Sequence, residues 1–158
     1  AGAFAEVGGL LQRHRQKAAL GEVMRVVGDV NKYVTDTEPF RLKGEDQRER
    51  LATVLHTLTQ CVSDCNLLLA PFVPHAANRV DAVLGGDGAL VPMPRVEDVD
   101  DLDGGPGYPV ITGDYSSFPR WEPTPVVVGT PIAKPSPVFV KLDAEEVVGT
   151  ERAAMAAE

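Results

Sequence analysis

The stretch with the most distinctive chemistry is residues 31–43, where an aromatic side chain stands beside two cations at a helix break. Pro39 bars the αR conformation at the residue before it and lacks a backbone donor, so a helix must end there. Phe40 follows, with Arg41 and Lys43 beside it. An aromatic ring at such a corner can stack on an unpaired base while the cations neutralise phosphates. The alternative is a Phe40 that caps a helical core beside two solvated cations.

The remaining reactive side chains are not grouped for catalysis. The three histidines fall on different predicted elements, and no Gly-x-x-x-x-Gly-Lys or Gly-x-Gly-x-x-Gly loop is present. Cys61 and Cys65 lie four residues apart in a helical pattern, which predicts two buried thiols. With His75 they would supply only three metal ligands, so we expect no metal site. The acidic residues between positions 97 and 103 are interpreted as a solvated linker instead of a divalent-ion site.

Negative charge is concentrated in the second part of the chain. Residues 1–85 hold ten basic and ten acidic residues, and residues 86–158 hold five and thirteen, which accounts for the net charge of −8. Affinity for nucleic acid comes largely from phosphate neutralisation, so any RNA contact must be local and lie on the neutral first part. No long apolar run or signal peptide is present, so we expect a cytoplasmic protein with neither a membrane nor DNA as its partner.

The elements that would position the corner are helices, because apolar residues recur at helical spacing through residues 4–11, 17–36 and 46–69. The expected apolar faces consist of Phe4, Val7, Leu10 and Leu11 in the first helix, Leu20, Val23, Met24, Val27, Val30 and Val34 in the second, and Leu51, Val54, Leu55, Leu58, Cys61, Val62, Cys65, Leu68 and Leu69 in the third. Pro74 begins a short fourth helix that ends near residue 84. Gly21 and Gly28 weaken the second helix, and close approach of a neighbouring helix would compensate.

The sequence changes character beyond residue 86. Residues 93–107 are acidic and rich in Gly and Pro, which predicts a loop or linker. Residues 108–142 should lie over another surface, with β-prone pieces at 108–112 and 125–128. A last helix should run from Asp143, its N-cap, to Met155.

We therefore expect a mostly α chain in three parts. These are an antiparallel helical bundle over residues 1–86, an acidic and then Pro/aromatic-rich irregular extension over 87–142, and a short C-terminal helix over 143–158. The first helix has neither an initiator Met nor a capping residue before it, so we expect the chain to be an excerpt of a longer protein.

Six short motifs follow one another in order along the chain. They are Phe-x-x-Val-Gly at 4–8, Lys-x-Ala-Leu at 17–20, Asn-x-Tyr at 31–33, Pro-Phe-x-Leu-Lys at 39–43, Leu-Leu-x-Pro-Phe-x-Pro at 68–74 and Leu-Gly at 84–85. In this order and spacing they resemble the anticodon-binding helical bundle at the C-terminal side of bacterial methionyl-tRNA synthetase, a class I methionine–tRNA ligase. Residues 134–143, Lys-Pro-Ser-Pro-Val-Phe-Val-Lys-Leu-Asp, look like the closing segment of that family.

The resemblance implies a tRNA-binding site on the corner. The family's Asn-x-Tyr and Pro-Trp motifs match Asn31, Tyr33, Pro39 and Phe40. In the family the aromatic residue after the proline stacks on an anticodon base of methionine tRNA. Here Phe replaces the usual Trp, so we expect the stack to survive at the low end of about 1–3 kcal/mol. The predicted site comprises Asn31, Tyr33, Pro39, Phe40, Arg41 and Lys43, although Lys43 could instead pair with Glu45 or Asp46.

The resemblance also implies an enzyme that uses ATP and magnesium when intact. The family's catalytic motifs, His-Ile-Gly-His and Lys-Met-Ser-Lys-Ser, are absent from these residues, so we expect this chain to have no catalytic residue, no cofactor and no ligase activity alone. Its implied partners are the anticodon loop of methionine tRNA and the catalytic domain of the same enzyme. The alternative function is a helical protein–protein interaction module with no nucleic-acid role, whose binding would depend less on salt.

Overall fold

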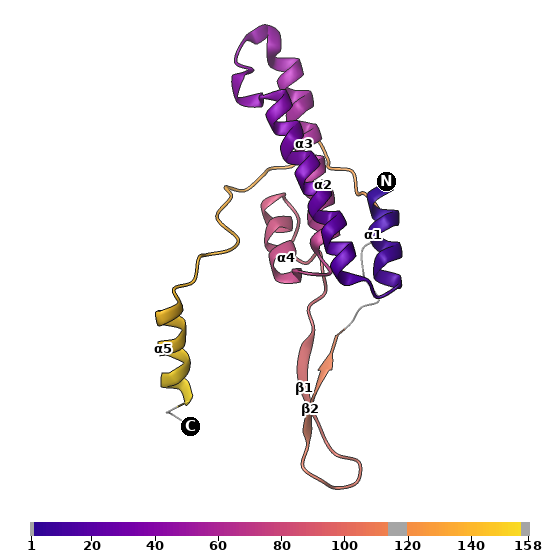
Figure 1. Ribbon diagram of the computed structural model, residues 1–158, viewed down its shortest axis with the longest axis vertical. Coiled ribbons are helices and arrows are strands. Elements are labelled where there is room, and N and C mark those ends of the chain that lie inside the picture. The colour runs from indigo at the N-terminus through magenta and orange to yellow at the C-terminus, as the bar shows by residue number, and fades with distance from the viewer. Residues whose placement is uncertain (1, 114–119, 156–158) are drawn as a thin grey trace.

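The computed structural model describes residues 2–113 and 120–155 (Figure 1). In these residues the helices are α1 (Gly2–Gln12), α2 (Gln16–Thr37), α3 (Arg48–Leu69), α4 (Pro74–Val83) and α5 (Ala144–Met155), with short 3₁₀ helices η1 (Pro39–Arg41) and η2 (Glu45–Gln47). The strands are β1 (Arg95–Val99) and β2 (Tyr108–Thr112). The expectation of a mostly α chain is confirmed. Residues 1, 114–119 and 156–158, which fall in the predicted bundle, extension and terminal helix, lie outside the described residues.

Helices α2 and α3 lie side by side as a long antiparallel hairpin (Figure 1). Each has 22 residues, which corresponds to a length of about 33 Å. The turn that joins them, residues 38–47, lies at the end of the hairpin that is far from α1 and α4 (Figure 1). We call this turn the hairpin tip. The helix pair therefore holds the tip away from the rest of the molecule.

The hydrophobic core lies at the opposite end of the hairpin. Its buried side chains come from α1, α2 and α3, and they are Phe4, Val7, Ala19, Val23, Leu67 and Leu68. Burying each of the Phe, Val and Leu side chains in this cluster contributes about 1.5–3 kcal/mol to the stability of the fold. A second, smaller cluster of Ala70, Ala77 and Val91 fixes α4 and the segment after it.

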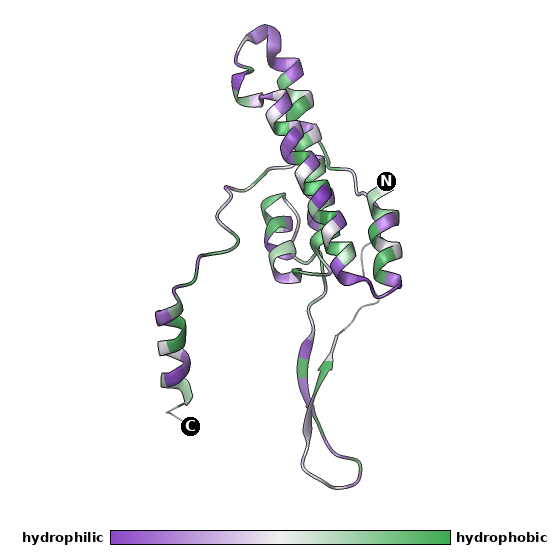
Figure 2. Cartoon of the chain, viewed as in Figure 1, coloured by the Kyte–Doolittle hydropathy of each residue, from purple (hydrophilic) through white to green (hydrophobic). Residues whose placement is uncertain are grey.

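Part of the apolar face predicted for α2 and α3 is exposed to solvent. Leu20 and Met24 of α2, and Leu55 and Val62 of α3, are exposed although the helical pattern assigned them to the core face. Figure 2 shows hydrophobic and hydrophilic residues alternating in bands along the helices of the hairpin. A pair of helices buries only a narrow stripe on each, so an apolar face wider than that stripe stays partly uncovered.

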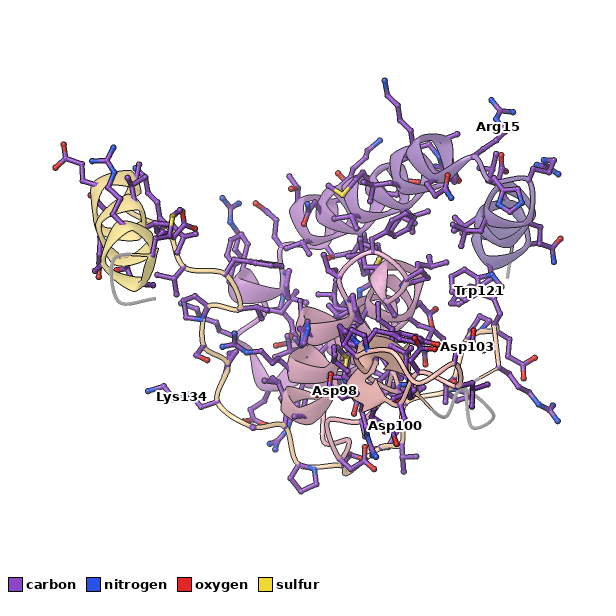
Figure 3. All side chains as sticks on the ribbon, turned by 90° about the horizontal axis from the view of Figure 1, so that it is seen from below. Arg15, Asp98, Asp100, Asp103, Trp121 and Lys134 are labelled. Atoms are coloured by element: carbon purple, nitrogen blue, oxygen red, sulfur yellow. The ribbon has the colours of Figure 1, made fainter. Side chains whose placement is uncertain are left out.

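The expectation that a neighbouring helix approaches Gly21 and Gly28 is wrong, because a Cβ atom at either position would meet nothing within 4 Å. The close approach occurs at Gly8 in α1, where an added Cβ would lie 2.7 Å from Nε1 of Trp121. That nitrogen donates a hydrogen bond to the carbonyl oxygen of Phe4 at 2.6 Å. The Trp121 and Phe4 rings meet edge to face, with their centroids 5.4 Å apart. Figure 3 shows Trp121 lying against α1.

The segment that was expected to be an irregular linker contains a strand. β1 pairs antiparallel with β2 in the register Val96↔Ile111 and Val99↔Tyr108. The resulting hairpin projects from the core end of the bundle (Figure 1). Strand β2 confirms the β-prone piece at 108–112, whereas residues 125–128 form no strand. The linker prediction failed at β1 because strand pairing depends on a partner further along the chain, which a local pattern does not reveal.

The segment after residue 120 crosses the helices as an extended strap, whereas residues 108–112, which were also expected to lie over another surface, form strand β2 of the projecting hairpin. The side-chain amide of Gln60 on α3 makes two hydrogen bonds to the backbone of the strap, donating to Thr124 O at 3.0 Å and accepting from Val126 N at 2.9 Å. The N–H of Ala133 then donates to Val83 O at the end of α4 at 2.9 Å. These bonds and Trp121 tie the strap to α1, α3 and α4.

Helix α5 follows the strap as a separate arm (Figure 1). Its N-cap is the predicted one, because Oδ1 of Asp143 accepts hydrogen bonds from the N–H groups of Glu145 and Glu146 at 2.9 and 3.2 Å. None of its described residues is buried. Across the described residues, no helix is both long enough and apolar enough to span a membrane.

Candidate nucleic-acid interface

The hairpin tip begins where α2 ends, at the residue before the proline. Glu38 adopts the left-handed conformation, with φ 40° and ψ 56°, and its N–H donates to Val34 O. A left-handed backbone costs a residue other than glycine roughly 1–2 kcal/mol. Pro39 then starts η1, so the helix end predicted from Pro39 is confirmed. The chain reverses direction in a turn that carries some backbone strain, which is a frequent property of binding sites.

Phe40 stands on this turn with its side chain largely in solvent. The residue is 63% exposed, and it belongs to neither hydrophobic cluster of the bundle. Phe40 therefore does not cap the core, which removes the structural alternative raised by the sequence. A large exposed aromatic ring has one face free for stacking on a planar ligand.

The two cations beside Phe40 have different surroundings. Nη1 of Arg41 lies 3.1 Å from Oε2 of Glu38, so the guanidinium is paired with a carboxylate. Lys43 is exposed, and within the described residues no carboxylate lies within 4.0 Å of its ammonium group. The expected alternative partner Glu45 lies 3.7 Å from Arg48 instead. The tip thus presents one paired and one unpaired positive charge next to an exposed ring, and it also carries the exposed carboxylates of Glu45 and Asp46.

Asn31 and Tyr33 lie on α2, outside the tip. Glu38 lies seven positions after Asn31, which corresponds to about 10 Å along the helix axis. Asn31 borders a shallow groove of about 250 Å³ between α2, α3 and α4. Tyr33 is half-buried, and residues two apart on a helix point about 200° away from each other. The structure therefore brings Pro39, Phe40, Arg41 and Lys43 together, and it places Asn31 and Tyr33 on two other faces.

Glu38 is a candidate residue that sequence reasoning missed. The signal was present, because Glu38 and Arg41 are three residues apart across a proline and oppositely charged. In a 3₁₀ turn, side chains three residues apart lie one above the other.

The other reactive side chains considered in the sequence are the two thiols of α3. Cys65 is buried and Cys61 is half-buried. Burial raises the pKa of both thiols, that of Cys65 to about 11, and the Asp64 carboxylate acts in the same direction. Both thiols are therefore protonated at neutral pH. Among residues 2–113 and 120–155, no three His, Cys, Asp or Glu side chains are close enough together to hold a metal ion.

Comparison with known proteins places this helical bundle among the aminoacyl-tRNA synthetases. No family model matches the chain. The methionine–tRNA ligase of a Nocardioides species is 61% identical over 143 residues, which are 90% of this chain and 24% of that enzyme. That of Beutenbergia cavernae is 60% identical over 144 residues, covering 89% and 23%. That of Kineococcus radiotolerans is 52% identical over 153 residues, covering 95% and 25%.

The chain belongs to the methionine–tRNA ligase family, as its motifs indicated. It spans about a quarter of the length of the curated relatives that it matches.

Proposed function

We propose that this chain is the C-terminal, tRNA-binding part of a methionine–tRNA ligase, and that its hairpin tip binds the anticodon loop of methionine tRNA. The observation that carries the proposal is Phe40, a large aromatic side chain that is 63% exposed at the far end of a helical hairpin. Bases in an anticodon loop are unpaired, so one of them can stack on the exposed ring. Such a stack contributes about 1–3 kcal/mol, with Phe expected at the low end.

The charge distribution is compatible with RNA at the tip, although the chain as a whole is acidic. Arg41 and Lys43 lie beside the ring and would contact phosphates of the loop. The acidic β1–β2 hairpin projects from the opposite end of α2 and α3 (Figure 1). Since the helices are about 33 Å long and charges are screened over about 8 Å at physiological salt, the acidic hairpin has little effect on a phosphate at the tip.

The remaining predicted residues have supporting roles in this proposal. Pro39 fixes the turn that exposes Phe40. Asn31 and Tyr33 shape the α2 surface that leads to the tip, and Asn31 could contact a base displaced toward its groove. We propose residues 1–86 as the RNA-recognition unit. Residues 87–142 and 143–158 would contact the catalytic domain of the same polypeptide.

The chemistry belongs to the intact enzyme, which would use ATP and magnesium to activate methionine in the cytoplasm and then transfer it to tRNA. This chain would supply no reacting group. Its contribution would be selection of the tRNA and placement of that tRNA relative to the catalytic domain.

The test is the affinity of the chain for methionine tRNA and for a copy with an altered anticodon, measured by fluorescence anisotropy at two salt concentrations. We expect preference for the methionine anticodon, a steep loss of affinity with salt, and a loss of about 5- to 10-fold in Phe40→Ala. Phe139→Ala is the matched control, because Phe139 is also an exposed phenylalanine but lies on the strap. Phe40→Trp should bind more tightly than the wild type. Equal losses in Phe40→Ala and Phe139→Ala, or no anticodon preference in a folded chain, would contradict the proposal.

A further inference from the structure

The two cations of the tip differ in one respect that matters for binding. Arg41 is held by Glu38 at 3.1 Å, whereas Lys43 has no carboxylate within 4.0 Å in the described part of the chain. We propose that Glu38 competes with RNA phosphate for Arg41 and so lowers the affinity of the tip for any tRNA. This inference rests on the proposed function, since it assigns a regulatory residue to the same site.

The local backbone builds this competition into the turn. Glu38 is left-handed, which ends α2 and turns the chain, and Arg41 N then donates to Glu38 O at 2.8 Å. The ion pair shows that the side chains of positions 38 and 41 lie on the same side of this turn. The carboxylate therefore faces the guanidinium as a result of the same geometry that exposes Phe40.

The pair is weak enough for RNA to break. The side chains of Arg41 and Glu38 are 71% and 39% exposed, and one guanidinium nitrogen makes the contact. Exposed ion pairs of this kind are weak and are screened by salt. A phosphate can engage a guanidinium through two parallel N–H donors, so it replaces Glu38 when the loop is bound. Glu38 is thus a competitor that RNA can displace.

The expected consequence is a lower affinity that does not depend on sequence. Contacts to phosphate carry no base information, so Glu38 should weaken binding of matched and altered anticodons by the same factor. Changing an exposed charge alters mainly the association rate and its salt dependence. Glu38 would then slow the capture of any tRNA, and the ratio of the affinities for the two anticodons would be unchanged.

The experiment measures dissociation constants and rates for Glu38→Gln with the same two tRNAs. Removal of the carboxylate should raise the affinity for both by about two- to fivefold, the range expected from an exposed ion pair. Because salt screens the exposed pair between Glu38 and Arg41, the gain should be largest at low salt and should shrink as the salt concentration rises. Glu38→Asn, which suits a left-handed backbone, is the second variant and should behave in the same way.

Two controls separate the proposal from simpler explanations. Glu22→Gln removes the same charge from a similar pair on α2, because Glu22 and Arg25 are also three residues apart, and it should leave affinity unchanged. In an Arg41→Ala background, Glu38→Gln should lose most of its effect.

The outcomes also distinguish the inference from the proposed function. Weaker or unchanged binding by both Glu38 variants, or an equal gain in Glu22→Gln, would overturn the role of Glu38 while anticodon preference in the wild type still supports the function. A wild-type chain without anticodon preference would overturn both.

Discussion

From the contact between Gly8 and Trp121 we predict that Gly8→Ala destabilises the chain when Trp121 is present and stabilises it when Trp121 is replaced by alanine. Alanine in place of glycine inside a helix normally stabilises by about 1 kcal/mol. At Gly8, however, the new Cβ would lie 2.7 Å from Nε1 and 3.1 Å from Cδ1 of Trp121. The indole would have to leave, and its hydrogen bond to Phe4 O and its edge-to-face contact with the Phe4 ring would be lost.

The magnitude follows from these two contacts. The hydrogen bond contributes about 1 kcal/mol net, and the aromatic pair contributes about 1 kcal/mol. Subtracting the helix gain of about 1 kcal/mol, we expect Gly8→Ala to lower the free energy of unfolding by about 1 kcal/mol. In a Trp121→Ala background there is no indole to displace, so the same substitution should raise the free energy of unfolding by about 1 kcal/mol.

Urea unfolding followed by circular dichroism measures all four variants of this cycle. Gly21→Ala and Gly28→Ala are matched controls, since their Cβ atoms meet nothing within 4 Å and each should stabilise by about 1 kcal/mol. A coupling of about 2 kcal/mol between positions 8 and 121 is expected. If Gly8→Ala stabilised the wild-type chain as much as Gly21→Ala does, Trp121 would not hold the strap on α1 and the reasoning would be refuted.

Three further predictions concern the core, a thiol and the terminal helix. Leu68→Ala should lower the free energy of unfolding by about 3 kcal/mol, measured by urea unfolding, because Leu68 is 1% exposed in the main core. Leu55 is exposed, so a loss in Leu68→Ala as small as that in Leu55→Ala would count against this core. Burial raises the pKa of Cys65 from 9.0 to about 11, so the folded state binds the thiol proton more tightly than the unfolded state. The contribution of this thiol to the free energy of unfolding should be fully present below pH 9 and be lost as the pH rises through 11. Rapid alkylation of Cys65 at pH 8 in the folded chain would contradict this. Asp143→Ala should reduce the helicity of residues 144–155, measured by Cα chemical shifts, because the N-cap is lost. The unfolding midpoint of the bundle should stay unchanged, because α5 has no buried residue among those described. A lower midpoint would indicate that α5 packs on the bundle.

The helices could be predicted from the sequence because their causes are local. Apolar residues at helical spacing located α1 to α3, Pro39 located the end of α2, Pro74 located the start of α4, and Asp143 located the start of α5. The exposure of Leu20 and Met24 could not be predicted, because the helical pattern shows which face is apolar and not how much of it a neighbour covers.

The contacts that depend on distant parts of the chain were not predictable. Trp121 binds Phe4 across 117 positions, and β1 exists because Val96 and Val99 pair with residues beyond the acidic loop. The segment 125–128 has β-prone residues, yet the Val126 N–H is bound by the Gln60 side chain and not by a second strand. Pattern and propensity describe a segment alone, and tertiary partners decide between its possible states.

The relative positions of the six predicted site residues could likewise be predicted only in part. Four of its residues are neighbours in sequence, and they meet at the tip because a single turn holds them. Asn31 and Tyr33 were included because of the motif, and only the helix geometry revealed that they lie on different faces. The ion pair between Glu38 and Arg41 depends on the left-handed backbone of Glu38, which Pro39 does not specify, because a residue before proline is only barred from αR and usually becomes extended.

The most direct test of the account is where an anticodon stem-loop of methionine tRNA contacts the chain, observed by NMR of the chain labelled at its phenylalanine rings and backbone amides. We predict that the ring signals of Phe40 shift upfield, as stacking under a base requires, and that the largest amide changes fall in residues 38–43. Phe4 and Phe139 should change little, because the first is buried and the second lies on the strap. Binding that leaves the Phe40 signals unchanged and perturbs another surface would contradict the claim that the hairpin tip reads the anticodon.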